Sequence, residues 1–168
     1  MAAMNPILYL GIEGVLFRDH VHCHSSHRAL LPTSFLEPLP LLEPLVTVVA
    51  RHDELCIVLN SWLVTDYGFR QVLHILPQRI AEKTIGATMH GNRLHRRPIG
   101  YQARAEMLRE DVHKRTPSQI TIVDASHSAI PPEYNDRAIW VETTNISFAP
   151  RFEAILSTLL EPGHPSYT

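Results

Sequence analysis

Polar side chains follow three apolar segments of this 168-residue chain, at positions where their types and spacing could do chemistry. Carboxylates, an amide and a hydroxyl can bind ligands or transfer protons when they meet at one place. In open α/β sheets that place is the edge formed by the carboxyl ends of the strands. A carboxylate beside a buried strand is unfavourable unless it is paired or solvated. The residues concerned are Glu13, Asn60, Ser61 and Asp124.

A second group of residues suited to chemistry lies shortly after the first apolar segment, within residues 19–27. Imidazoles and thiolates are the usual ligands of Zn²⁺ and other transition metals. The spacing matches no closed structural zinc pattern, and alternating ligands point in opposite directions when the chain is extended. We therefore favour a plain polar segment and keep a transition-metal site as an alternative. Its candidate ligands are His20, His22, Cys23 and His24.

Short apolar runs predict the strands that would position the polar side chains. Three of the runs are nearly continuous in apolar residues, which is typical of parallel strands with both faces covered by helices. The three runs are 7–10, 55–59 and 119–123. We expect a shorter strand at 137–141 and a further extended piece at 83–86.

Helical periodicity fills the intervals between the predicted strands. The ranges are 39–51, 67–76, 97–112 and 148–160, with Pro77 ending the second and Ser147 as a candidate cap of the last. The alternation of strands and helices predicts a three-layer, Rossmann-like α/β fold with a parallel sheet and helices on both faces. We expect a single domain over 1–160, a small flap at about 17–32, no large cap domain, and a tail at 161–168.

Composition limits the classes of function. The hydrophobic fraction of 45% is ordinary for a globular protein, and the formal net charge of −2 gives no field that would attract nucleic acid or an anionic membrane. Two cysteines do not indicate a disulfide framework. The sequence shows neither a signal peptide nor an apolar run long enough to span a bilayer. We therefore expect a cytoplasmic protein.

Several segments resemble, in order, the motifs of the haloacid dehalogenase-like (HAD) phosphohydrolase superfamily. Within it, the chain resembles the HAD domains of Swiss-army-knife RNA-repair proteins over about residues 6–160. The segments are Leu8-Tyr9-Leu10-Gly11-Ile12-Glu13-Gly14-Val15-Leu16, Ile57-Val58-Leu59-Asn60-Ser61-Trp62, Thr84-Ile85-Gly86-Ala87-Thr88, Ile122-Val123-Asp124-Ala125 and Thr143-Thr144-Asn145-Ile146-Ser147. The resemblance implies a HAD-like fold and places residues 19–27 in the flap beside the site.

The resemblance also implies roles for the polar residues. Glu13 takes the acid/base position, whereas Gly11 stands where the family has its nucleophilic aspartate. Asp124, with Glu13, takes the position of a Mg²⁺ ligand, although Ala125 replaces a second acidic residue. The resemblance implies four phosphate-holding candidates: Ser61 or Asn60, and Arg97 or Arg104.

Three functions are compatible with these residues. We favour a HAD-like protein that is catalytically impaired at Gly11 and acts as a binding or regulatory module for a phosphorylated small molecule or a protein. The alternative is an active Mg²⁺-dependent phosphatase that uses Glu13 and Asp124 with metal-activated water. The third is a metal-binding protein built on the histidine-rich flap.

Overall fold

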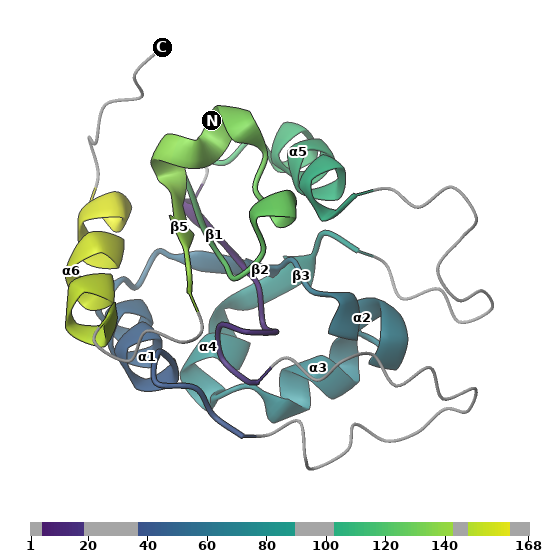
Figure 1. The fold of residues 1–168 in the computed structure, drawn as a ribbon. Coiled ribbons are helices and arrows are strands. Elements are labelled where there is room, and N and C mark those ends of the chain that lie inside the picture. Colours follow the sequence, from purple (N-terminus) through teal and green to yellow (C-terminus); the bar gives the residue numbers. More distant parts are fainter. Residues whose placement is uncertain (1–4, 19–36, 90–102, 143–147, 162–168) are drawn as a thin grey trace.

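Five short parallel strands form one sheet in the computed structural model, which describes residues 5–18, 37–89, 103–142 and 148–161 (Figure 1). The strand order is β3-β2-β1-β4-β5. The strands are β1 (Ile7–Leu10), β2 (Cys56–Leu59), β3 (Thr84–Ala87), β4 (Ile120–Asp124) and β5 (Ala138–Trp140). The sheet with its helices is the predicted Rossmann-like α/β arrangement.

Strand β1 lies at the point where the order of the sheet reverses. The chain first adds β2 and β3 on one side of β1, and then β4 and β5 on the other. Leu10 is paired with Leu59 of β2 and with Val123 of β4. Such a reversal opens a crevice beyond the carboxyl ends of the two central strands. The residues that follow β1 and β4 therefore lie side by side.

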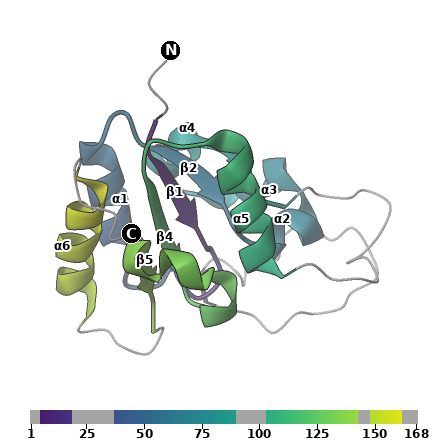
Figure 2. The same ribbon diagram turned by 90° about the horizontal axis from the view of Figure 1, so that it is seen from above.

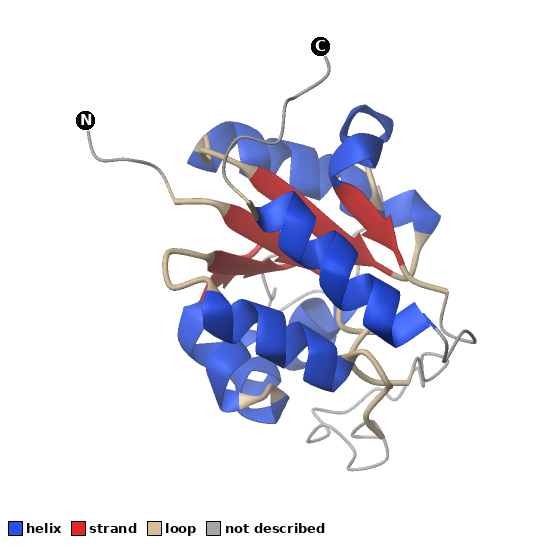
Figure 3. Ribbon diagram, turned by 90° about the vertical axis from the view of Figure 1, so that its left-hand side faces the viewer, coloured by secondary structure: helices blue, strands red, loops and turns tan. Residues whose placement is uncertain are grey.

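Helices cover both faces of the sheet, as Figures 2 and 3 show. The chain crosses over one face before the reversal and over the other face after it, and α6 returns to pack beside α1. The helices are α1 (Leu42–Arg51), α2 (Trp62–Tyr67), α3 (Phe69–Ile75), α4 (Gln78–Lys83), α5 (Arg104–Arg115) and α6 (Ala149–Leu160). The 3₁₀ turns η2 (His127–Ala129) and η3 (Pro132–Arg137) precede β5.

The period-two alternation of each strand divides the core into two parts. Leu8 and Leu10 of β1 face the larger part, which contains residues of α1, α2, α3, α4 and α6. Ile7 and Tyr9 face the smaller part, which includes Leu108 of α5. Both faces of β1 are buried, and this accounts for its continuous apolar sequence.

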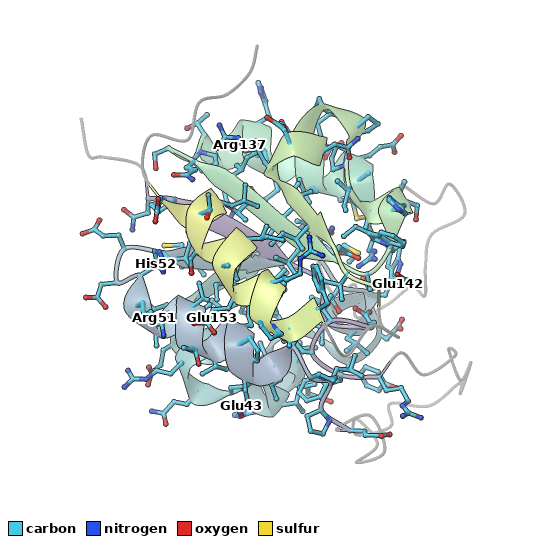
Figure 4. The ribbon with its side chains drawn as sticks, turned by 60° about the vertical axis from the view of Figure 1, so that its left-hand side comes forward. Glu43, Arg51, His52, Arg137, Glu142 and Glu153 are labelled. Carbon is cyan, nitrogen blue, oxygen red and sulfur yellow. The ribbon has the colours of Figure 1, made fainter. Side chains whose placement is uncertain are left out.

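The two helices on the outside of the larger core are joined at their surface by one ion pair. Arg51 of α1 donates to a carboxylate oxygen of Glu153 of α6 at 2.8 Å (Figure 4). The Arg51 side chain is 60% exposed, so the pair contributes less than about 1 kcal/mol. The packing of α1 against α6 therefore depends on buried apolar side chains such as Val48 and Phe152.

The strand predictions are correct in number and type, with ends displaced by one or two residues. The run 7–10 is confirmed in full, and 55–59 begins one residue later in the structure. The run 119–123 is displaced by one residue, so Asp124 is the last residue of β4 rather than the residue after it.

The predicted helix 67–76 is confirmed as α3 with displaced ends, whereas α2 was not predicted. Gly68, whose φ of +89° does not belong to a right-handed helix, separates α2 from α3. Helix α4 is the second helix that was not predicted. It begins immediately after Pro77, a residue that ends one helix but is also compatible with the start of the next.

The other helix predictions were correct in position but not at their ends. Helix α1 begins at Leu42 rather than at 39, α5 continues to Arg115, and α6 begins at Ala149. The expected start of the third helix at 97 and the cap Ser147 lie outside the described residues, as does most of the flap and of the tail. In the described ranges, no helix has the length and apolar character needed to cross a membrane.

Candidate functional site

Gly11 follows β1 and is in direct contact with the carboxylate that ends β4. The backbone N–H of Gly11 donates to the carbonyl oxygen of Val123 at 2.8 Å, which continues the pairing of the two strands. A Cβ built on Gly11 would lie 2.5 Å from Oδ2 and 2.8 Å from Cγ of Asp124. The space of a side chain at residue 11 is therefore occupied by Asp124.

Asp124 is fully buried and is fixed through one of its two carboxylate oxygens. Oδ1 accepts hydrogen bonds from Nη2 of Arg104 and from the backbone N–H of Ser126, both at 2.9 Å. Burial raises the pKa of Asp124 to about 6, although Arg104 and the Ser126 N–H oppose the increase and the charge of Glu13 adds to it. The carboxylate is thus held in place but only partly compensated.

Glu13 reaches from the loop after β1 to the start of α2. Its Oε1 accepts from the backbone N–H of Leu63 at 3.2 Å. The same N–H also donates to Oγ of Ser61, which caps α2. Ser61 is therefore the N-cap of α2 in this structure.

Asn60, the residue after β2, is buried and held by the residue after β3. Its Oδ1 accepts from Oγ1 of Thr88 at 2.9 Å. The backbone N–H of Asn60 donates to Leu10, so the residue continues the pairing of β2 with β1. These contacts fix the amide plane and direct Nδ2 away from Thr88.

Arg104 reaches the site from α5, on the other face of the sheet from α2. It is the first residue of α5, and only 11% of its side chain is exposed. Nη1 donates to the backbone carbonyl of Asn60 at 2.6 Å and Nη2 to Asp124 at 2.9 Å. A planar guanidinium that spans two acceptors in this way joins the ends of β2 and β4 through α5.

Three buried polar atoms of this edge have no hydrogen-bond partner among the described residues. Such an atom typically costs about 1–3 kcal/mol unless water or a ligand satisfies it. All three belong to residues predicted for the site, and they comprise two acceptors and one donor group: Glu13 Oε2, Asp124 Oδ2 and Asn60 Nδ2. All the buried side-chain atoms without a partner in the described structure therefore lie at this edge, where a polar ligand could pair with them.

The residues present do not fit a Mg²⁺ ion well as they are arranged. A hard cation of this kind takes oxygen ligands, and the two unpaired carboxylate oxygens could supply two of them. However, the guanidinium of Arg104 already pairs with one of the two oxygens of Asp124. No group of three or more His, Cys, Asp or Glu side chains within the described ranges is arranged to hold a metal ion.

The structure brings together most of the residues predicted for the site. Gly11, Glu13, Asn60, Ser61, Asp124 and Arg104 meet at the carboxyl edge of the sheet. Arg97 and the candidate metal ligands His20, His22, Cys23 and His24 lie outside the described residues. Thr88 was given no role from the sequence, although it follows a predicted strand just as the other site residues do.

Comparison with known proteins agrees with the observed fold. A search among curated proteins found no match to the chain. The family model described as the HAD domain in Swiss Army Knife RNA repair proteins matches residues 7–147, which include every strand and the whole site. The HAD-like phosphohydrolase fold follows from this match together with the parallel sheet. The chain belongs to the family of HAD domains found in Swiss Army Knife RNA repair proteins.

Proposed function

We propose that this chain is a catalytically impaired HAD domain that acts as a binding or regulatory module. The observation that carries the proposal is the contact between Gly11 and Asp124. Residue 11 has no side chain to attack phosphorus, and the carboxylate of Asp124 lies 2.5 Å from where a Cβ would begin. Loss of a covalent nucleophile typically lowers the rate by several orders of magnitude.

The unpaired polar atoms support a binding role. Glu13, Asn60 and Asp124 each keep one buried atom without a partner in the described structure. Apolar side chains at these positions would avoid the free-energy cost of unpaired buried polar atoms. The presence of three such atoms at one edge therefore favours a binding role. Hydroxyl or N–H donors of a bound group, from a phosphorylated small molecule or from a protein, would satisfy the two carboxylate oxygens, and a phosphate or carbonyl oxygen would accept from Nδ2 of Asn60.

The test is turnover of an aryl phosphate by the purified full chain at high enzyme concentration, with Mg²⁺ and with Mn²⁺. We expect no release of the phenol above the level of an Asp124→Ala control, and no increase in protein mass from a phosphoenzyme. Saturable binding of phosphorylated compounds, measured by calorimetry on the same preparation, is expected without turnover.

The competing phosphatase hypothesis predicts a different result in the same assay. It depends on Glu13 and Asp124, whose unpaired oxygens are the observation in its favour. Turnover that requires Mg²⁺ and disappears in the Asp124→Ala variant would overturn the proposal of an impaired domain. The flap hypothesis is tested separately, by metal analysis of the untagged protein before and after substitution of His20 and His22.

A further inference from the structure

Arg104 is held against the acidic edge by two hydrogen bonds within the protein. Nη1 donates to the carbonyl of Asn60 at 2.6 Å and Nη2 donates to Asp124 at 2.9 Å. These two bonds fix the guanidinium beside the carboxylate, whatever its other N–H groups bind. The side chain is nearly buried, and its partner Asp124 is 1% exposed.

Arg104 places its positive charge beside Asp124, at the acidic edge where a cation would otherwise be attracted. Asp124 presses against Gly11, and the charge of Glu13 acts on Asp124. Two carboxylates and the carbonyl of Asn60 form a set of oxygen atoms of the kind that hard cations bind. The guanidinium takes two atoms of this set, so a divalent ion would have to sit beside a fixed positive charge.

We propose that Arg104 is a built-in cation that keeps divalent metal ions out of this site. The charge of Arg104, from α5, offsets one of the two carboxylates of the edge, and the remaining unpaired atoms are left for a polar ligand rather than for a metal. This inference goes beyond the proposed function because it concerns which ligands the edge admits. Its test uses no phosphate substrate, so its failure is distinct from failure of the impaired-domain proposal.

The inference predicts that removal of the Arg104 charge creates a cation site. The probe is Mn²⁺, titrated into the full chain while electron paramagnetic resonance measures the free ion. The quantity of interest is the binding that Asp124→Asn abolishes, which separates this edge from any other site on the chain. We expect Arg104→Gln to bind one Mn²⁺ at least about tenfold more tightly than the wild-type protein, a change of about 1.4 kcal/mol.

Two further variants serve as controls. Arg104→Lys keeps the charge but loses the planar fork, and it should bind Mn²⁺ as weakly as the wild-type chain. The double variant Arg104→Gln, Asp124→Asn should lose the gained site. Far-ultraviolet circular dichroism establishes that each variant is folded before titration.

Two results would overturn the inference. One is equal Mn²⁺ binding by the wild-type chain and Arg104→Gln, whether both bind or neither does. The other is stoichiometric Mn²⁺ binding by the wild-type chain that Asp124→Asn removes. The second measurement needs no change at Arg104, so it remains decisive even if Arg104→Gln does not fold.

Discussion

At the scale of single residues, the site is defined by the contact between the smallest side chain and a buried acid. The resemblance to HAD phosphohydrolases implies a nucleophilic aspartate at residue 11. Here Asp124 fills that space, and its position is fixed by Arg104 and by the Ser126 N–H. The absence of a side chain at residue 11 and the position of Asp124 therefore belong to the same contact.

We predict that Gly11 and Asp124 are energetically coupled. Gly11→Ala should lower the free energy of unfolding by roughly 1–3 kcal/mol, because the new methyl group displaces a carboxylate that cannot easily move. In an Asp124→Ala background the same substitution should have an effect smaller by at least about 1 kcal/mol. Urea denaturation of the four proteins of this double-mutant cycle measures the coupling.

Gly68→Ala is the matched control for that cycle. Its cost has a different origin, since Gly68 has a φ of +89° and no atom within 4 Å of an added Cβ. The effect of Gly68→Ala should therefore be the same with and without Asp124. Additive effects of Gly11→Ala and Asp124→Ala would contradict the proposed contact.

The sequence indicated which residues meet, but not which hydrogen bonds and ion pairs they form. Strand ends alone were sufficient to select Glu13, Asn60 and Asp124. That Arg104 binds Asp124, or that Thr88 holds the amide of Asn60, depends on side-chain directions across different strands. A one-dimensional pattern does not contain those directions.

At the scale of elements, two helices are followed by a residue with a positive φ, and only one of these residues suits that conformation. The α2–α3 boundary is made by Gly68 in a conformation that suits glycine. Helix α5 ends at Arg115, and its C-cap Thr116 lies in the left-handed region, with φ 43° and ψ 56°. A β-branched residue is unfavourable there, whereas glycine and asparagine are common.

We predict that Thr116→Gly stabilises the protein. Relief of the strained backbone should exceed the extra freedom gained by the unfolded chain, with a net increase in the free energy of unfolding of roughly 0.5–1 kcal/mol. Thr116→Asn should give a smaller increase. Thermal or urea denaturation measures both, and a loss of stability in Thr116→Gly would mean that the threonine side chain compensates for its backbone.

At the scale of the whole molecule, the site depends on the order of the strands. The sequence predicted parallel strands and helices on both faces, but it contained no signal for the order β3-β2-β1-β4-β5. The reversal at β1 places Gly11 against Asp124, although the two residues are far apart along the chain. Pairing between distant strands is decided by packing of the complete core, which local periodicity does not determine.

The buried acid makes the stability of the whole fold depend on pH. The pKa of Asp124 is about 6 in the folded protein and has an ordinary value of 3.8, so the folded state binds this proton more tightly. The stabilisation is fully present below about pH 4 and is lost as the pH rises through about 6. The unfolding free energy of Asp124→Asn minus that of the wild type should therefore rise by roughly 1–3 kcal/mol across this window. Urea denaturation at several pH values measures this difference, in which the other titrating groups largely cancel. A difference that does not change between pH 4 and pH 6 would mean that Asp124 is as well compensated in the folded protein as in water.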